Sequence, residues 1–471
     1  MCGINYSRVD FNIKNLNFKN LIKKIDDGLD KKKYSEVLNY VKKLRCNYIF
    51  LELVKKNVRK KNHLHKILKN IKEKKDKSLE SEKYDYICDI EWVLENEVIN
   101  FSEKIINFSS KNNITLNNKS IIFIRHFLHS IDSINYLESR GRDSVGLSIN
   151  MISSTPYKFK KNVHNNLKIS VFSKRLKEKK YLINITLKFA KRIGYSGENV
   201  KEIYKLFQKT IFNNINYNNL KLFEIFSHTR WASVGEVNIS NTHPHIEVRK
   251  NEIDLNIMNG DIANYKDLIL NLQFEGKKIS TDKKCTNDLK PIPALTFDNK
   301  DSLYDKISGS FVLLNFNSKT PDQLKIYKKG SQGLYYTKDE DDCFHLSSDV
   351  YGLVNKSDNF LKLEKNGKNI LNKKFIKKIN KKNIKKTDLL TSDLDKKNHN
   401  RYFLKEVGDT SEILKRTIEN YINFDKKIIK NMDNLFTSKI KKSLLQKKIK
   451  NIIFTGMGSC YTAAVGISKY L

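Results

Sequence analysis

The chain has 471 residues and a formal net charge of +37, from 89 Lys and Arg against 52 Asp and Glu. This length accommodates two or three domains with a sizeable hydrophobic core. No run approaches the ~18 uninterrupted apolar residues that a membrane span needs, and the start lacks a signal-peptide pattern, so we expect a cytoplasmic protein with no membrane partner.

The positive charge comes mostly from lysines spread along the whole chain. A nucleic-acid-binding module would interleave basic with aromatic residues, and no stretch does so regularly, so we expect no specific nucleic-acid partner. The six cysteines are scattered, without CxxC pairs or the spacing of metal ligands. This argues against a disulfide framework or a zinc site, and we expect neither a metal nor a cofactor.

The start of the chain holds a possible nucleophile. Cys2 follows Met1 directly and precedes Gly3 and Ile4. Removal of Met1 would put a thiol and a free α-amine on one residue, and an α-amine with a pKa near ~7.7 to 8.0 can accept the thiol proton at neutral pH. Nucleophile and base would then share one residue. The alternative is an incidental cysteine at a permissive position.

Secondary structure follows from the spacing of apolar residues. Residues 11–122 form a lysine-rich block with helical periodicity, and a second basic stretch at about 174–214 also predicts helix. Short apolar runs broken by Gly, Asn and Asp predict strands; they are residues 146–152, 222–226, 253–258 and 309–316.

The C-terminal part changes character. Residues 356–400 are dominated by Lys and Asn and predict a partly ordered linker. Helical periodicity returns at 402–431, and 450–471 predicts a strand, a Gly-rich turn and the start of a helix.

Two internal motifs suggest chemistry. Arg230, expected at a strand end, can grip a carboxylate by two parallel hydrogen bonds, with Trp231 covering the pocket; the alternative is a structural arginine beside a packed indole. Asn259 and Gly260 can supply a side-chain amide and a backbone N–H to a developing oxyanion, with no side chain on Gly260 to block the substrate; the alternative is an ordinary turn.

The order of the motifs resembles the glutaminase domain of the class II glutamine amidotransferases and, among them, the glucosamine-6-phosphate synthase family. The similar segments of the first half are Cys2-Gly3-Ile4, Arg140-Gly141-Arg142-Asp143-Ser144, His228-Thr229-Arg230-Trp231-Ala232, His243-Pro244-His245 and Asn259-Gly260-Asp261. Those of the second half are Phe403-Leu404-Lys405-Glu406-Val407 and Gly456-Met457-Gly458-Ser459-Cys460-Tyr461.

The resemblance implies an α/β (α+β) fold of the N-terminal nucleophile (Ntn) hydrolase type, a four-layer αββα sandwich. It also implies roles at the glutamine site. Cys2 would attack the glutamine amide, Asn259 and Gly260 would stabilise the oxyanion, and Arg230 would hold the α-carboxylate with Trp231 closing the pocket. His243 would line the site, and Asp288 would bind the α-amine, in preference to the alternative Asp282.

For the second half, the resemblance implies a sugar-isomerase domain of which the chain carries only the beginning. Gly458, Ser459 and Cys460 would form its sugar-phosphate turn, since a Gly-rich turn before a helix binds anions; Cys460 lacks the hydroxyl of the family's serine. A lone βα unit cannot bury its own faces. The chain is therefore either a fragment, our preference, or docks onto a partner.

The expected domains are an amidotransferase domain at 1–355 with a helical insertion at about 10–120, a linker at 356–400, and linker helices with an incomplete sugar-isomerase domain at 401–471. The expected activity is release of ammonia from glutamine for transfer to a keto-sugar phosphate, fructose 6-phosphate, giving glucosamine 6-phosphate in a homodimeric full-length enzyme. The alternative is a non-catalytic, sugar-phosphate-responsive regulator or assembly module. Val234, Met258 and Cys460, which depart from the family pattern, favour that alternative.

Overall fold

The structure is a computed structural model and divides into two compact units, Met1–Asp395 and Lys396–Leu471. The residues that it describes are 2–55, 57–75, 81–138, 141–157, 163–164, 167–191, 197–210, 215–279, 282–297, 303–377, 379, 383–395, 399, 402–423, 428–429, 437–455 and 459–469.

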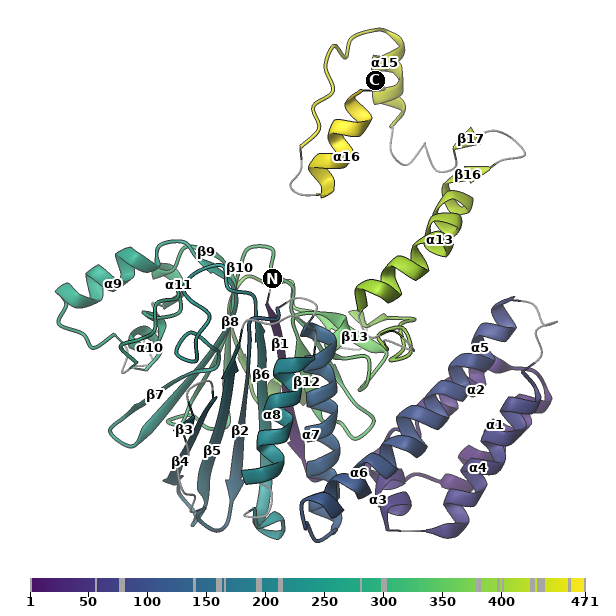
Figure 1. The fold of residues 1–471 in the computed structure, drawn as a ribbon, viewed down its shortest axis with the longest axis horizontal. Coiled ribbons are helices and arrows are strands. Elements are labelled where there is room, and N and C mark those ends of the chain that lie inside the picture. The colour runs from purple at the N-terminus through teal and green to yellow at the C-terminus, as the bar shows by residue number, and fades with distance from the viewer. Residues whose placement is uncertain are drawn as a thin grey trace. The chain divides into compact units, whose positions relative to one another are not determined.

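The first unit contains two sheets (Figure 1). The ten-stranded sheet has the order β15-β13-β11-β12-β1-β6-β2-β5-β4-β3, and the five-stranded sheet has the order β14-β10-β9-β8-β7. The strands of the first are β1 (Gly3–Asp10), β2 (Ser144–Ser153), β3 (Val163–His164), β4 (Leu167–Arg175), β5 (Tyr181–Ala190), β6 (Leu220–Arg230), β11 (Tyr335–Lys338), β12 (Phe344–Ser347), β13 (Asn359–Lys362) and β15 (Lys385–Lys386). Those of the second are β7 (His245–Arg249), β8 (Glu252–Ile262), β9 (Gly309–Asn317), β10 (Leu324–Lys329) and β14 (Gly367–Leu371).

The strands form because their apolar residues alternate between two buried faces. In β6, Phe223 and Ile225 face the helical layer, whereas Phe226 packs between the two sheets. Every strand pair has antiparallel register, and the central strand β1 pairs Gly3 with Thr229 of β6 and Asn5 with Ser347 of β12.

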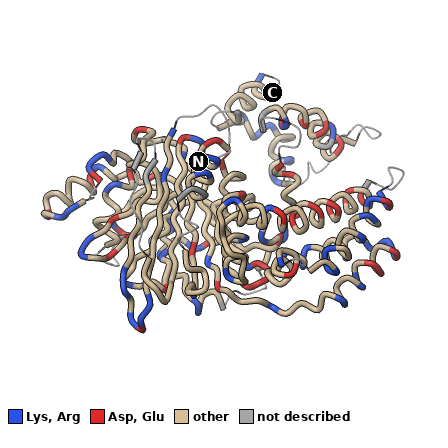
Figure 2. The backbone as a smooth tube through the Cα atoms, turned by 60° about the horizontal axis from the view of Figure 1, so that its bottom comes forward, with Lys and Arg blue, Asp and Glu red and all other residues tan. Residues whose placement is uncertain are grey.

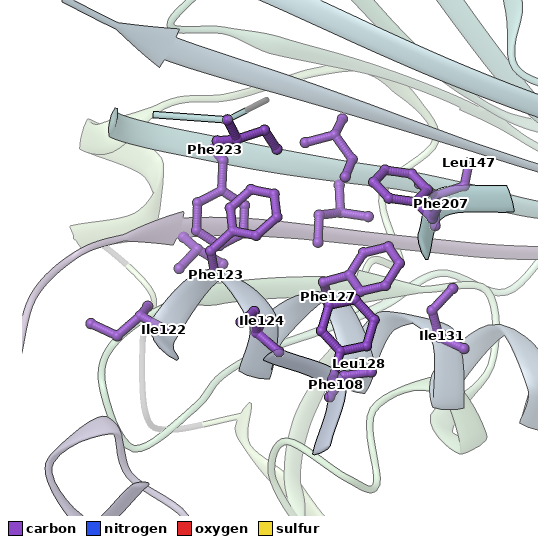
Figure 3. Packing of buried hydrophobic residues seen from close by; sticks show 14 of the residues in the cluster. Phe108, Ile122, Phe123, Ile124, Phe127, Leu128, Ile131, Leu147, Phe207 and Phe223 are labelled. Atoms are coloured by element: carbon purple, nitrogen blue, oxygen red, sulfur yellow. The ribbon is translucent and has the colours of Figure 1, made fainter. Parts of the chain in front are cut away.

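Helices cover the outer faces of both sheets. α7 (Asn118–Leu137) and α8 (Glu198–Thr210) pack on the ten-stranded sheet through a phenylalanine-rich core (Figure 3). α9 (Tyr265–Phe274) and α10 (Ile292–Thr296) pack on the five-stranded sheet. Helix, sheet, sheet and helix thus form four layers, which confirms the predicted αββα sandwich. Shorter helices are α11 (Leu303–Lys306), α12 (Lys373–Lys377) and the 3-10 turns Tyr217–Asn219 and Val350–Gly352.

The lysine-rich block between β1 and α7 folds as a helical bundle with its own hydrophobic core. Its helices are α1 (Phe18–Asp30), α2 (Tyr34–Lys42), α3 (Asn47–Val54), α4 (Val58–Glu73), α5 (Ser81–Trp92), the π-helical turn η1 (Val93–Ile99) and α6 (Asn100–Lys111). In α2, Val37 and Val41 point inward, and Lys42 is buried as well, whereas Lys33 before it is exposed. Figure 2 shows these basic residues interleaved with acidic ones along the bundle.

Residues from the predicted linker at 356–400 lie in both the sandwich and the bundle. β13 and β14 extend the two sheets, and Leu390 belongs to the core of the bundle. Asp358 accepts ion pairs from Lys42 and Arg45 of the bundle, all with buried side chains. This segment therefore ties the insertion to the sandwich.

Two predictions of local structure are wrong. Among its described residues, the stretch at about 174–214 is helical only in α8; Tyr181–Ala190 is the buried strand β5, whose Leu182 and Ile183 point to opposite apolar layers. Residues 451–455 form no strand, since no described segment pairs with them. A strand needs a neighbour for its backbone hydrogen bonds.

The second unit contains helices with largely exposed side chains. Its elements are α13 (Tyr402–Tyr421), the short pair β16 (Ile422–Asn423) and β17 (Ile428–Ile429), α15 (Ser438–Leu445) and α16 (Ser459–Ser468). Among the described helices of either unit, none has the length and apolar character needed to cross a membrane.

Candidate active site

Cys2 lies at the start of the central strand β1, beside the end of β6. Its Sγ is 3.3 Å from the backbone N of Trp231 and 3.6 Å from the backbone O of the same residue. Burial raises the pKa of the Cys2 thiol, and the Trp231 backbone contact and the nearby Arg230 charge oppose this shift. The thiol is therefore neutral at pH 7 and needs a base to become a nucleophile.

Arg230 is the last residue of β6 and is buried. Its guanidinium donates hydrogen bonds to the carbonyls of Glu236, at 3.1 Å, and Val234. Burial lowers the pKa of Arg230. Arg230 thus holds the loop at 231–236 in place next to Cys2. The indole of Trp231, in contrast, is half exposed, at 51%.

Gly141 and Asp143 support this loop from the other side. A Cβ on Gly141 would lie 2.6 Å from the carbonyl carbon of Arg230, so only glycine allows the close approach. Asp143 accepts a hydrogen bond from the backbone N–H of Ala232 at 2.8 Å, and its own N–H donates to the Arg230 carbonyl at 3.0 Å. The two residues therefore fix the turn that carries Arg230 and Trp231.

Asn259 and Gly260 lie in β8, next to the same loop. Gly260 has φ +97°, and a Cβ there would lie 2.0 Å from the backbone oxygen of Ser310. The Asn259 Oδ1 is buried without a hydrogen-bond partner among the described residues. Ser233 Oγ donates to Asp261 Oδ1 at 3.1 Å, which joins the arginine loop to this end of β8.

The two aspartate candidates have different surroundings. Asp288 is buried, accepts a hydrogen bond from the Ile262 backbone N–H at 2.9 Å, and acts electrostatically on both Cys2 and Arg230. Burial raises the pKa of Asp288 to about 6. Asp282 accepts the backbone N–H of Lys284 at 3.1 Å in a local turn. The charge of Asp288 therefore acts on both the Cys2 thiol and the Arg230 guanidinium.

His243 lies behind the site, with both ring nitrogens close to donors. Nδ1 faces the backbone N–H of Met258 at 3.4 Å, and Nε2 faces the amide of Asn287 at 3.4 Å. Burial lowers the pKa of His243 well below its ordinary value, so the ring is neutral. It packs at 4.3 Å against the His228 ring, whose Nε2 contacts the Met258 carbonyl at 2.9 Å. These rings position β8.

Asn241 is a structural residue of the site that the sequence analysis missed. Its Oδ1 accepts the backbone N–H groups of Thr286, at 2.7 Å, and Asn287, at 3.1 Å, and its Nδ2 donates to the Glu236 carbonyl at 3.0 Å. It therefore joins the arginine loop to the segment that carries Asp288. No motif in the sequence marks it, because the two backbone donors that it joins to the arginine loop lie 45 and 46 residues away.

Of the predicted sugar-phosphate turn, Gly458 lies outside the described residues. Ser459 begins α16, and Cys460 is exposed on that helix in the second unit.

A search against protein-family models finds no match. In sequence, the chain is 27% identical over 259 residues to the glutamine–fructose-6-phosphate aminotransferase (isomerizing) of Clostridium tetani, covering 52% of this chain and 40% of that protein. It is 26% identical over 364 residues to the enzyme of the same name from Buchnera aphidicola subsp. Acyrthosiphon pisum, covering 74% and 50%. The chain resembles the glutamine–fructose-6-phosphate aminotransferases.

The chain spans about half the length, or less, of these relatives. Among solved structures, the glutamine phosphoribosylpyrophosphate amidotransferase from B. subtilis matches at 12% identity with a TM-score of 0.28, covering 52% of this chain and 46% of that one.

Proposed function

We propose that Cys2 is the nucleophile of a glutamine-hydrolysing reaction. With Met1 removed, the α-amine of Cys2 takes the thiol proton, and Sγ attacks the side-chain carboxamide carbon of glutamine. The tetrahedral intermediate expels ammonia, which receives that proton, and leaves a glutamyl thioester. Water then hydrolyses the thioester to glutamate and the free thiol.

The convergence of Cys2 at the start of β1, Arg230 at the end of β6 and Asp288 in the turn before α10 carries this proposal. Arg230 can hold the substrate α-carboxylate and Asp288 its α-amine, which places the carboxamide at Sγ. Asn259 and the Gly260 N–H are the donors for the oxyanion, and the φ of +97° at Gly260 supports such a backbone arrangement. Two opposite charges on a zwitterionic amino acid match the two opposite charges of the site.

We infer further that the ammonia goes to a keto-sugar phosphate, with fructose 6-phosphate as the acceptor and glucosamine 6-phosphate as the product, in a homodimer of the longer enzyme. The names of the relatives and the motif at Gly458 to Cys460 support this acceptor. This chain covers 40% and 50% of the length of those two relatives, so we assign the transfer to fructose 6-phosphate to the longer enzyme.

Glutamate release from glutamine tests the nucleophile. Cys2→Ala should lower the rate by at least about 10³-fold, because no other group supplies the nucleophile. Cys285→Ala, which removes a buried thiol near His245, is the matched control and should keep the rate. Equal rates in Cys2→Ala and the parent chain would refute the assignment. Retention of Met1 should abolish the activity as well.

A matched pair tests the aspartate. Asp288→Asn should raise the KM for glutamine by about 10-fold or more, because it removes a charge-assisted hydrogen bond worth about 1.5–3 kcal/mol. Asp282→Asn should leave KM unchanged. The reverse result would assign the amine site to Asp282.

One contact favours the second candidate function, a non-catalytic regulator on the same scaffold. The Arg230 guanidinium already donates to the carbonyls of Val234 and Glu236, and these acceptors compete with a substrate carboxylate. A regulator would show no glutamine turnover with Met1 removed but would bind a keto-sugar phosphate.

A further inference from the structure

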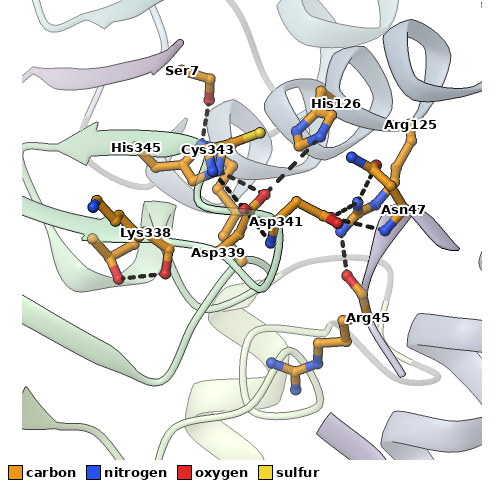
Figure 4. Close-up of polar contacts among 12 residues, drawn as sticks. Ser7, Arg45, Asn47, Arg125, His126, Lys338, Asp339, Asp341, Cys343 and His345 are labelled. Atoms are coloured by element: carbon orange, nitrogen blue, oxygen red, sulfur yellow. Dashed lines mark hydrogen bonds and ion pairs between the residues drawn. The ribbon is translucent and has the colours of Figure 1, made fainter. Parts of the chain in front are cut away.

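A second buried polar cluster lies on the helical side of the ten-stranded sheet, independent of the proposed glutaminase chemistry. His126 comes from α7, Asp339 from the β11–β12 turn and His345 from β12 (Figure 4). Their side chains are at most 2% exposed, and one ligand atom of each lies within 4.8 Å of the other two. Among the described residues, this is the group whose geometry suits a metal ion.

Two of the three side chains are already oriented by outer partners. Asp339 Oδ1 accepts the backbone N–H groups of Asp341, at 3.0 Å, and Cys343, at 2.9 Å, which turns Oδ2 toward the histidines. His345 Nδ1 is 2.8 Å from Ser7 Oγ, and its Nε2 is 3.1 Å from Asp339 Oδ2. Metal-binding histidines commonly have their second ring nitrogen fixed in this way.

The row Ser7, His345, Asp339 also has the residue types of a hydrolytic triad. Ser7 is 0% exposed, however, so no substrate reaches its hydroxyl. A nucleophilic role is thereby excluded, and the contact acts as an orienting hydrogen bond.

His126 is a buried polar side chain whose ring nitrogens form no hydrogen bond within the described part of the protein. It is 0% exposed, and neither ring nitrogen has a hydrogen-bond partner among the described residues. Its Nε2 is 4.0 Å from Asp339 Oδ2. In its neutral form an imidazole offers a nitrogen lone pair to a metal ion.

We propose that His126 Nε2, Asp339 Oδ2 and His345 Nε2 bind a divalent transition-metal ion, with Zn²⁺ as the ion to test. Two imidazoles and a carboxylate suit zinc rather than Ca²⁺ or Mg²⁺, which prefer all-oxygen sites. Zinc bonds of about 2.0–2.2 Å place tetrahedral ligand atoms roughly 3.5 Å apart. His126 must therefore approach Asp339 from 4.0 Å by about 0.5 Å, and a pair of ligand atoms at the 4.8 Å limit of the group must close by about 1.3 Å.

The surroundings of the cluster indicate a structural role for the ion. Arg125, next to His126, pairs with Asp341 at 2.7 Å and also donates to Asn47 and to the Arg45 carbonyl of the inserted bundle. A metal at His126 would fasten α7 to β12 at the point where the insertion meets the sandwich.

Metal content tests the site directly. The full chain carrying Cys2→Ala and Cys460→Ala, which removes the thiol at the start of β1 and the exposed thiol of α16, is loaded with Zn²⁺, dialysed and analysed by atomic emission. One equivalent should remain. His126→Gln should lose it, whereas His129→Gln, which changes a buried histidine one turn along α7, should retain it. Equal zinc content in His126→Gln and His129→Gln, or none in the parent, would overturn the proposal.

A second variant covers the case in which His126→Gln does not fold. Ser7→Ala removes only the outer contact of His345 and should weaken Zn²⁺ binding by about 10–100-fold, measured against a chromophoric chelator. Unchanged affinity would count against His345 as a ligand. Co²⁺ in place of Zn²⁺ should give the visible bands of a tetrahedral site in the parent chain, and bands that persist in His126→Gln would refute the assignment.

Discussion

Replacement of Gly260 by alanine tests two reasons for glycine at this position: the backbone conformation and the lack of space for a Cβ. The residue has φ +97°, a conformation that costs an L-residue about 1–2 kcal/mol. The new Cβ would in addition lie 2.0 Å from the Ser310 carbonyl oxygen, in β9, which β8 pairs with. Overpacking of this kind costs about 1–3 kcal/mol. Gly260→Ala should therefore lose about 2–5 kcal/mol of unfolding free energy.

Gly367→Ala is the matched control, since Gly367 has φ +118° and a Cβ added there would meet no heavy atom within 4 Å. Its loss should be limited to the backbone cost of about 1–2 kcal/mol. Urea unfolding followed by far-UV circular dichroism gives both values. The same Gly260→Ala chain should release glutamate about 10²–10³-fold more slowly, because the N–H leaves its oxyanion position. Equal stability losses in the two variants would refute the steric argument.

Three further outcomes are expected. Arg8→Met leaves the buried Glu224 carboxylate without its ion-pair partner at 3.0 Å and should cost about 3–5 kcal/mol in urea unfolding; the double variant with Glu224→Gln should recover part of it, and no recovery would contradict the pairing. Glutamine kcat/KM should fall as the pH drops through about 6, because protonated Asp288 cannot bind the α-amine; a profile unchanged in Asp288→Asn would count against this. Asp358→Asn removes the ion pair of buried Lys42 and one of the two ion pairs of Arg45, which keeps Glu97, and should cost about 3 kcal/mol or more, against less than about 1 kcal/mol for the exposed Asp342→Asn; similar costs would show that the insertion is not held there.

The raised pKa of Asp288 also sets the sign of its effect on stability. A carboxyl whose folded pKa lies above its ordinary value stabilises the folded state at low pH, and this contribution disappears as the pH rises through about 6. Asp288→Asn should therefore flatten the pH dependence of the unfolding free energy above the ordinary aspartate pKa. A steeper dependence in the variant would contradict the burial of an ionisable group here.

The sequence predicts those strands whose apolar runs are bounded by breakers, such as the cores of β8 and β9. It fails at β5, because lysines before and after Tyr181–Ala190 suggest a solvent-facing helix although the strand has both faces buried. It also fails to place Leu363, Leu371 and Leu390, apolar anchors in a Lys- and Asn-rich segment, each of which belongs to a packed hydrophobic core. Tertiary burial decides these segments, and local composition does not report it.

Residue type and order along the chain identify Cys2, Arg230 and Asp288 as candidate site residues. The structure places the three close enough for their charges to interact. The buried His126 cluster has no such signal. Its ligands come from a helix, a turn and a strand, and spacing rules for metal sites apply to residues close in sequence. The prediction that the chain has no zinc site rested on the spacing of its cysteines. Cysteine spacing cannot predict or exclude a site built from histidines and a carboxylate.

The position of β1 in the middle of its sheet has a consequence for the timing of assembly. The first strand to leave the ribosome needs β12 as its neighbour, and Ser347 bonds to Ile4 across a sequence separation of 343 residues. At about 5–20 residues per second, synthesis of that interval takes roughly 20–70 s. The inserted helical bundle can fold from local contacts during this interval, whereas the Cys2 thiol has not yet reached its final position. Cys2 thus reaches its position beside Trp231 only after the segment that carries Ser347 has been synthesised.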